Sequence, residues 1–572
     1  MTTVDNGCHY KGSSMQRRLT MIFVFFIGIS AVCADPVWAL SEQVRENLRQ
    51  RIESAGVPPR LSVGEEVIYS SVVLPDFYID RTFIPAWSDD SGSLPVADSL
   101  VSAIAQADRE GLFPEDYHLE KIREVLDTVR AEQKPGQTPD SMLLVDLDLL
   151  LTDAFLVYAS HLFGGKLDPV SLDPEWHPAR HGADFAGILE KALAENRVHE
   201  ALLDLLPAHR EYFRLRDVLA NYRKIASEGG WPQIPTGPAM KKGSKGELVT
   251  ALRQRLMLTG DLKPDAFEES DDFDELLEEA VRRYQGRHGL ETDGIVGRQT
   301  FAELNTPVEQ RLEQVMINLE RWRWLPQSLG ERYILVNIAG FELEVVENGQ
   351  KVMTMRTIVG RHYRRTPVFT GTMTYLVFSP FWNIPSGIVA KDVLPQVKKD
   401  IAYLEKNNIR VFQGWGANTV PIDPATISWS EITPANLRYR FRQDPGPDNA
   451  LGQVKFMFPN RFNVYLHDTP ARELFLKTVR NFSSGCIRVE DPVSLAEYLL
   501  ADRPAWRRAE IEAAMERNVE RTVTITDPLP VHLLYWTAWA TEEQEIHFRQ
   551  DIYNRDKHVS KALQPKSVTG GR

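Results

Sequence analysis

The spacing of apolar residues changes once along this 572-residue chain, near residue 330. Before that point they recur every three or four residues, as in Leu143, Leu147 and Leu150, which is the period of an amphipathic helix. From residue 332 the period is two, and Phe341 and Leu343 alternate with glutamates, which predicts half-buried strands. We therefore expect a multidomain α+β protein in which helical parts precede a β-rich part.

Length and composition set the scale of this fold. At about 150 residues per domain the chain has room for roughly three or four domains. Its residues are 43% hydrophobic and 25% charged, which is enough apolar material for ordinary globular cores. The net charge of −13 argues against a nucleic-acid partner, because such proteins present a basic face.

The N-terminus has the three parts of a secretory signal. Arg17 and Arg18 precede an apolar run over 19–30, and small residues follow as far as Ala34. The run is short for a membrane span of about 20 residues. We expect 1–34 to be a signal peptide that exports the protein to the periplasm, and an uncleaved anchor to the inner membrane is the alternative.

Helical spacing continues through most of the first 326 residues. Residues 42–240 are expected to form a helical scaffold domain, without the spacing of metal ligands or a phosphate-binding loop. A connecting helix is expected over 306–326. Thr306 with Glu309 three residues later, and Pro307 between them, predicts a capping box at its start.

Residues 243–305 carry a dense set of turn and core signals. Apolar residues around Leu252 and around Val281 predict two helices, and Gly289, Asp293-Gly294 and Gly297 mark tight turns between short elements. This order of motifs resembles the three-helix peptidoglycan-binding domain type 1. The resemblance implies that fold; such a unit either binds glycan or serves as a spacer.

The β-rich part is expected over 327–540, with a C-terminal tail over 541–572. Asn348-Gly349 between two alternating runs predicts a β-hairpin. The segment 386–454 has no clear strand rhythm, and its position before the chemistry-bearing residues suggests a capping insertion or lid. Further strands are expected at 372–378, 455–458, 463–466, 522–525 and 531–538.

One thiol stands out in this part of the chain. The three cysteines are Cys8, Cys33 and Cys486, and the first two lie in or before the expected signal. A lone exported thiol has no disulfide partner in its own chain, which favours a nucleophilic role. His467 lies 19 residues upstream, at the end of a predicted strand, and an imidazole is the group that a catalytic thiol needs beside it.

The loop that delivers Cys486 suggests further roles. The amides around Gly485 and Cys486 are candidate oxyanion donors, and Gly485 leaves room for a substrate carbonyl. Arg488 is expected either to bind a substrate carboxylate or to brace the loop. Asp468 or Thr469 is expected to cap a helix that runs to about Arg480. A structural cysteine with a satisfied histidine is the alternative to catalysis.

The order His467, eighteen residues, then Ser484-Gly485-Cys486 resembles the catalytic signature of the L,D-transpeptidase (YkuD) family, and the likeness extends over about 330–540. The whole arrangement resembles the large, YcbB-like Gram-negative type. This implies that Cys486 is the nucleophile and His467 the general base. Ser484 stands where many members have a second histidine. The remaining substrate-binding candidates beside Arg488 are Tyr465, Trp382 and Asn383.

The resemblance also implies the reaction. An acyl-enzyme forms from a peptidoglycan tetrapeptide stem with loss of its terminal D-Ala, and a second stem then gives a 3→3 cross-link, with no metal or cofactor. Carboxypeptidases and glycan synthases are the expected suppliers of substrate. The alternatives are lipoprotein attachment, exchange of D-amino acids, or a non-catalytic peptidoglycan-binding scaffold. A peptidase of the NlpC/P60 type would carry its cysteine before its histidine, the reverse of this order.

Overall fold

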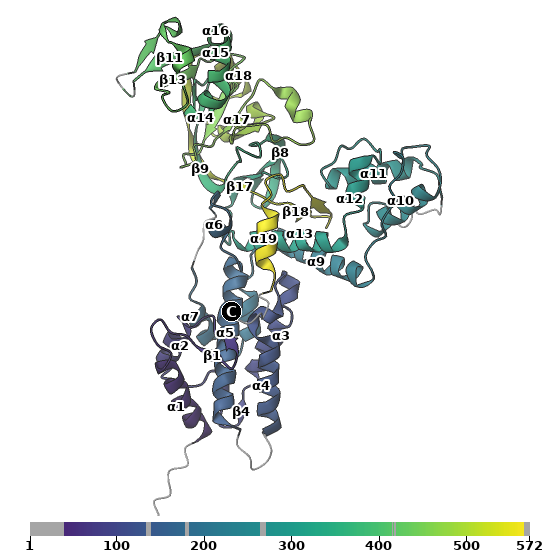
Figure 1. Cartoon of the computed structure of the whole chain (residues 1–572), viewed down its shortest axis with the longest axis vertical. Coiled ribbons are helices and arrows are strands. Elements are labelled where there is room, and N and C mark those ends of the chain that lie inside the picture. Colours follow the sequence, from purple (N-terminus) through teal and green to yellow (C-terminus); the bar gives the residue numbers. More distant parts are fainter. Residues whose placement is uncertain are drawn as a thin grey trace, which may run out of the picture.

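The computed structural model describes residues 39–132, 139–177, 182–263, 270–414, 416 and 419–565, so the expected signal at 1–34 lies outside them. The molecule is elongated, with a helical bundle at one end, a small cap at the other and a three-helix unit beside the middle (Figure 1). Within the described ranges, no helix has both the length and the apolarity that crossing a membrane requires.

The helical bundle is built around α5 (Ser141–Gly164), which is buried on nearly all sides. Asp140 caps this helix by accepting from the Met142 N–H. The buried Asp148 carboxylate accepts from the Tyr78 hydroxyl and from the amides of Ala86 and Trp87, which fastens the preceding loop to α5. The other helices are α1 (Leu40–Glu53), α2 (Leu74–Asp80), α3 (Val96–Ile104), α4 (Leu119–Glu132), α6 (Pro169–Leu172), α7 (Phe185–Ala194), α8 (Val198–Leu203) and α9 (Arg210–Ser227), with short β1–β2 (Ser62–Val63, Glu66–Val67) and β3–β4 (Ser88–Asp89, Gly92–Ser93) ribbons.

The three-helix unit has a hydrophobic core of its own. It comprises α10 (Glu247–Leu258), α11 (Glu275–Arg287) and α12 (Arg298–Leu304). The buried Gln285 amide donates to Asp293 Oδ1 and accepts from the Gly294 N–H, which holds the predicted Asp-Gly turn. Ile234 and Met240 belong to this core, so the unit begins some residues before 243.

The connecting helix is α13 (Val308–Arg323), and its predicted capping box is wrong. Pro307 occupies the N-cap position without a side-chain cap, while the Thr306 hydroxyl faces back to the Ala302 carbonyl. At the end of this helix Trp322 and Trp324 are both buried, so the aromatic side chains here serve packing.

The β-rich part forms a closed barrel. Its strands follow the order β14-β15-β16-β8-β7-β6-β17-β9, and β14 pairs with β9 to close the ring. The strand β5 (Trp176–His177), which lies between α6 and α7 of the helical part, pairs in parallel with β9. The strands are β6 (Arg332–Asn337), β7 (Glu342–Glu347), β8 (Gln350–Ile358), β9 (Val368–Phe378), β14 (Val454–Met457), β15 (Leu466–His467), β16 (Ile487–Val489) and β17 (Arg521–Leu534).

Local turn signals predicted part of this barrel. The Asn348-Gly349 hairpin is confirmed, with Glu347 opposite Gln350 and positive φ at both turn residues. The strands expected at 522–525 and 531–538 are instead one strand, β17, with an irregularity between Thr524 and Leu529. The described part of the segment expected as a tail, 541–565, contains β19 (Ile546–Phe548), which pairs with β18 (Ala538–Ala540), and α19 (Asp556–Leu563).

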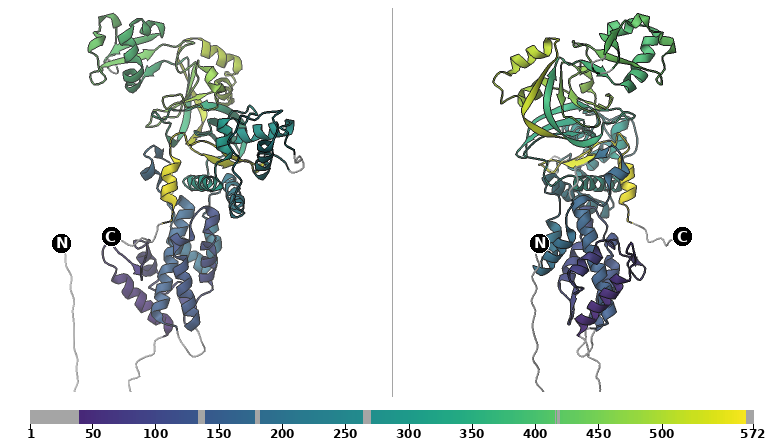
Figure 2. Two further views of the ribbon diagram at one scale, coloured as in Figure 1. Left: turned by 45° about the vertical axis from the view of Figure 1, so that its right-hand side comes forward. Right: turned by 90° about the vertical axis from the view of Figure 1, so that its left-hand side faces the viewer.

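The cap is a small subdomain at the far end of the barrel (Figure 2). It begins before the insertion predicted at 386–454, since its four-stranded sheet starts with β10 (Trp382–Ile384), and Val454 already belongs to the barrel strand β14. The absence of strand rhythm was misleading, because the strands are only three to five residues long. The other elements are α14 (Ser386–Ile388), a π-helical turn (Val389–Val393), α15 (Leu394–Lys399), α16 (Ala402–Lys406), β11 (Ile409–Gln413), β12 (Val420–Ile422) and β13 (Tyr439–Gln443).

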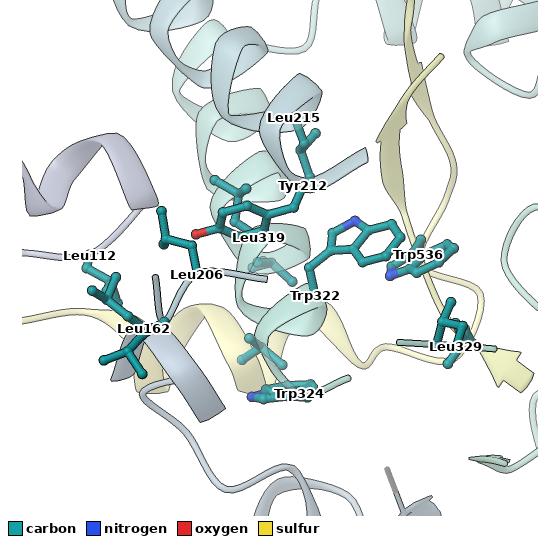
Figure 3. Close-up of a cluster of buried hydrophobic side chains, with 14 of the residues drawn as sticks. Leu112, Leu162, Leu206, Tyr212, Leu215, Leu319, Trp322, Trp324, Leu329 and Trp536 are labelled. Atoms are coloured by element: carbon teal, nitrogen blue, oxygen red, sulfur yellow. The ribbon is translucent and has the colours of Figure 1, made fainter. Parts of the chain in front are cut away.

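One hydrophobic core joins the helical bundle to the barrel. Figure 3 shows Trp322 of α13 against Trp536, which follows β17; their rings stack with centroids 4.2 Å apart. Tyr212 of α9 and Leu162 of α5 approach the same cluster from the bundle. The barrel is therefore held on the bundle by buried side chains rather than by a linker.

Candidate active site

The loop before Cys486 is held by its own hydroxyl groups. Ser483 Oγ donates to the Cys486 carbonyl (2.5 Å) and accepts from the Gly485 N–H (3.1 Å). Thr366 Oγ1 donates to the Gly485 carbonyl (2.9 Å). Gly485 has φ +119°, a conformation that side chains other than glycine rarely adopt. These contacts present the partly buried Cys486 at the start of β16 in one orientation.

Strand register brings four of the predicted residues to one face of the barrel wall. In the parallel pair β15–β16, Leu466 lies opposite Ile487 and His467 opposite Arg488. The buried Leu466 and Ile487 point into the barrel core. Since side chains alternate along a strand, Tyr465, His467, Cys486 and Arg488 share the opposite face.

Tyr465 is the nearest polar neighbour of the thiol. Burial raises the pKa of Cys486 to about 11, although the Tyr465 N–H and hydroxyl, which bond to the sulfur, and the Arg488 guanidinium all act to lower it. The sulfur also lies 3.8 Å from the Asn463 carbonyl. Tyr465, predicted as a substrate-binding residue, thus contacts the sulfur itself, and its role toward a substrate stays a prediction.

His467 is buried and oriented by backbone carbonyls. Burial, helped by the nearby Arg488 charge, lowers the pKa of its imidazole to about 3. Nδ1 lies 2.5 Å from the Asp468 carbonyl, which suits a hydrogen on this nitrogen, and the Leu451 carbonyl is a second backbone partner of the ring. Among the hydrogen bonds of the described residues there is none between His467 and Cys486. The two groups are diagonal neighbours across β15–β16.

The Arg488 side chain has no hydrogen bond to any residue in the described part of the chain, and its buried Nε is without a partner. Burial and the neighbouring Arg361 charge lower its pKa. A guanidinium that braced the loop would donate to loop carbonyls, as Arg480 does at Thr357, Lys477 and Phe341. Of the two predicted roles for Arg488, this geometry favours binding a ligand anion.

The oxyanion role expected of Gly485 needs correction. Its N–H is already engaged by Ser483 Oγ, whereas the Cys486 N–H has no partner within the described ranges. Ser484 is exposed, and its hydroxyl lies 2.8 Å from Arg364 Nη1. The Cys486 amide is therefore the better candidate donor of this loop.

Trp382 and Asn383 are not brought to this face by any contact in the described structure. Both lie on β10 of the cap, where Trp382 packs against the cap core and Asn383 is exposed opposite Arg442 of β13. The cap also reaches the loop through Arg364, a residue that the sequence did not indicate. Arg364 Nη1 lies 2.6 Å from Asp392 Oδ2 in the cap as well as beside Ser484.

The helix predicted after His467 is only a short 3₁₀ segment, Arg472–Leu476. Asp468 does not cap it, because its carboxylate accepts from the Gln453 N–H (2.9 Å) and from Arg472 Nη1 (3.1 Å). Asp491, by contrast, caps the next helix, α17 (Pro492–Leu499), by accepting from the Ser494 N–H. A further short helix, α18 (Arg508–Glu516), follows α17. Asp468 thus ties the segment returning from the cap to the strand that ends in His467.

No group of three or more histidine, cysteine or acidic side chains suited to a metal ion is found where the chain is described. What the site does offer is a thiol, a buried imidazole, a guanidinium and one backbone amide, the last two without a hydrogen-bond partner among the described residues. These are the groups that acyl transfer through a thioester uses.

Comparison with known families agrees with this class of fold. Residues 331–521 match the model of the L,D-transpeptidase catalytic domain (YkuD), 73–219 match a model described as a scaffold domain, and 245–304 match a model described as a "Putative peptidoglycan binding domain". The chain therefore carries a YkuD-family L,D-transpeptidase catalytic domain, joined to a scaffold domain and a peptidoglycan-binding domain.

Individual relatives give the same assignment. A Haemophilus influenzae protein named "Putative L,D-transpeptidase" is 36% identical over 270 residues, which cover 46% of this chain and 53% of that protein. The chain thus spans about half the length of this curated relative.

Solved L,D-transpeptidase structures are more distant. One from Xylanimonas cellulosilytica is 18% identical, and the match covers 52% of this chain and 99% of that one, with a TM-score of 0.17. One from Stackebrandtia nassauensis is 12% identical, and the match covers 53% of this chain and 96% of that one, with a TM-score of 0.21. Scores this low support no argument about function.

Proposed function

We propose that this protein forms 3→3 cross-links between peptidoglycan stem peptides through an acyl-enzyme on Cys486. The observation that supports this most directly is the shared face of β15 and β16, where the thiol, the imidazole and an unpaired guanidinium meet. The unpaired Arg488 suits the terminal carboxylate of a tetrapeptide donor, because guanidinium and carboxylate groups pair through two parallel hydrogen bonds.

In the first step, the Cys486 sulfur attacks the carbonyl of the third stem residue, and the thiol proton passes to His467 Nε2. The oxyanion develops next to the Cys486 N–H, which has no other partner in the described ranges. The C–N bond to D-Ala then breaks, and His467 returns the proton to the leaving amine. A thioester remains on Cys486.

In the second step, the side-chain amine of the third residue of another stem attacks the thioester. The new C–N bond forms as the C–S bond breaks, and the proton released by the amine returns through His467 to the sulfur. Both resting groups are neutral at pH 7, because burial raises the Cys486 pKa to about 11 and lowers the His467 pKa to about 3. Proton transfer therefore accompanies attack rather than preceding it.

The test is product analysis with the Cys486→Ala variant. With purified disaccharide-tetrapeptide as the substrate, mass spectrometry should detect 3→3 dimer and free D-Ala with the parent protein and neither with the variant. Circular dichroism checks that the variant is folded. Dimer formation at the parent rate by the Ala variant would remove Cys486 from the mechanism. Adding a lipoprotein peptide or free D-amino acids to the same assay decides which acceptor is preferred.

The periplasm is the proposed location, on the basis of the charged, apolar and small-residue order of 1–34. Fractionation of cells that express the full chain, followed by N-terminal sequencing, tests both export and cleavage. A cytoplasmic product with an intact N-terminus would contradict this location.

A further inference from the structure

A crevice of about 310 Å³ lies between the peptidoglycan-binding domain and the barrel. One wall is the turn 289–292 that follows α11, and the other consists of barrel segments that include 339–341 and 475–480. Figure 1 shows the three helices α10–α12 beside β18 and α13, which is the side on which the two domains meet. Nothing in the mechanism above uses this crevice.

The crevice is built by a fixed contact between the two domains. Gly289 has φ +65° and lies so close to Arg549 that a Cβ there would be 2.6 Å from its Cδ. Arg549 Nη1 donates to the Arg287 carbonyl (2.9 Å). The Phe548 ring lies between the His288 ring and the Arg311 guanidinium, at 5.4 and 4.6 Å. The same contacts fix the width of the crevice.

The lining of the crevice is strongly cationic. Its only charged residues are Arg356, Lys477, Arg480, Arg549 and, as the single carboxylate, Glu291. Burial lowers the pKa of Arg480 and of Arg549 to about 10, and in each case a neighbouring arginine contributes to the lowering.

Nearby carboxylates only partly offset these charges. Glu490 is bound to Arg356, and Glu342 lies near Arg480 and Arg549. Glu303 also lies near Arg549, but it is paired with Arg311. The side-chain amine of the exposed Lys477 has no hydrogen bond or ion pair in the described part of the chain. The crevice therefore has more positive charge than its own carboxylates neutralise, and it suits an anionic ligand.

The crevice is close in the chain to the nucleophile. Arg480 precedes Cys486 by six residues, which limits the separation of their Cα atoms to about 22 Å. The intervening segment is held in place, since the Arg480 carbonyl accepts from the Val359 N–H (2.9 Å) and Ser483 pairs with Gly360. Leu476 and Val479 are exposed at the rim, and they offer apolar contact beside the charges.

We propose that this crevice binds a free carboxylate of a peptidoglycan stem that belongs to the same strand as the stem reacting at Cys486. This inference rests on the proposed function for its choice of ligand. Peptidoglycan stems carry free carboxylates, and the crevice combines positive charge with walls from a peptidoglycan-binding domain and from the catalytic domain. The crevice would thereby hold the polymer in register with the catalytic face.

Binding of a soluble peptidoglycan oligomer to the full chain tests this proposal. Calorimetry with Cys486→Ser protein prevents turnover, and the oligomer is used both with free stem carboxylates and with those carboxylates amidated. Lys477→Glu should weaken binding of the free-carboxylate oligomer at least tenfold, and Arg356→Gln should also weaken it. Lys557→Glu is the matched control, an exposed lysine on α19 outside the crevice. The amidated oligomer should bind the Cys486→Ser protein as weakly as the free-carboxylate oligomer binds the same protein with the added Lys477→Glu substitution.

Equal affinities for the parent and both crevice variants would overturn the proposal, as would an equal loss with Lys557→Glu. Turnover of a donor with a single stem separates this result from the proposed function. The Lys477→Glu variant that retains Cys486 should have a kcat/KM for this single-stem donor within twofold of the value for the unsubstituted protein. If the parent makes no 3→3 dimer but its binding still depends on Lys477 and on free carboxylates, the cross-linking function fails and the crevice stands.

Discussion

At the residue scale, the resting state of Cys486 and His467 is decided by burial. The thiol and the imidazole both lie out of bulk water, which disfavours the charged form of each. Their pKa values of about 11 and about 3 leave a neutral pair across the whole range from pH 5 to pH 9. Cys486 is thus unlike a thiolate that an imidazolium stabilises in advance.

We predict that alkylation of Cys486 by iodoacetamide has no plateau near neutral pH. Because the thiolate is the reactive form, the rate should rise about tenfold per pH unit from 7 to 9 and be half-maximal near pH 11. Mass spectrometry of the intact protein over time gives the rates, and free cysteine provides the reference with its pKa of about 8.5. A plateau between pH 5 and pH 8 would show a preformed thiolate–imidazolium pair.

For Arg488→Gln we expect a substrate effect without loss of stability. The guanidinium makes no hydrogen bond to the described residues and is largely buried, so its removal leaves no protein partner unsatisfied. A lost charged hydrogen bond to the donor carboxylate corresponds to about 1.5–3 kcal/mol, or roughly 10–100-fold in kcat/KM. Kinetics with a tetrapeptide donor and with its C-terminal amide measure this. The variant and the parent should differ little on the amide, and an equal loss on both donors would contradict carboxylate binding.

The site was predictable where its residues are close in the sequence. Cys486, His467 and Arg488 fall within 22 positions of one another, and short-range patterns showed them. The contact of Tyr465 with the sulfur was not predictable, because it depends on the parallel register of β15 and β16. Arg364 was missed, since its partners Ser484 and Asp392 are 120 and 28 residues away.

At the element scale too, features set by residues close in the sequence were predictable, and features set by contacts between distant segments were not. The Asn348-Gly349 hairpin was predictable because turn chemistry is local. The cap sheet and the addition of β5 to β9 depend on pairing between distant segments, so no local pattern marks them. The helix expected after His467 fails because Asp468 bonds to Gln453 of the returning cap segment instead of capping it.

We predict that Arg364 holds the cap against the catalytic loop. Its side chain is 12% exposed and bridges Asp392 and Ser484, while Asp392 is itself 46% exposed, which limits the pair to about 1 kcal/mol. Arg364→Met should therefore increase hydrogen exchange of α14 and α15 about fivefold and lower kcat/KM by a similar factor. Exchange mass spectrometry with peptides from 386–399 provides the measurement.

Two further variants make the Arg364 test specific. Asp392→Asn should reproduce the exchange change, and the double variant should add little to either single variant because the pair is shared. Lys406→Gln breaks an exposed ion pair with Asp400 inside the cap and should leave exchange of α14 unchanged. Additive effects of Arg364→Met and Asp392→Asn would contradict a direct coupling.

At the scale of the whole molecule, the hydrophobic cores do not follow the domain boundaries that the family matches give. The scaffold domain, α13 and the barrel share one continuous core, whereas the peptidoglycan-binding domain and the cap each have a separate core. The junction is formed by aromatic side chains of α13 and of the segment after β17 (Figure 3). The catalytic face therefore belongs to the same packed unit as the scaffold domain. The peptidoglycan-binding domain and the cap, which have separate cores, lie on either side of the barrel.

The shared core predicts that the scaffold domain and the barrel unfold together. Trp322 is 3% exposed and stacks on Trp536, so Trp322→Ala should cost about 3–5 kcal/mol. Exchange protection should fall equally in α5 and in β17, on opposite sides of the junction, and remain unchanged in α11. Phe301→Ala is the matched control, because Phe301 lies only in the core of the peptidoglycan-binding domain and its loss should expose α11 alone. Exchange mass spectrometry under mild denaturant measures all three elements. Loss of protection in β17 while α5 stays protected would show that the scaffold domain is an independent folding unit, and the barrel would then be hinged on the scaffold rather than fixed to it.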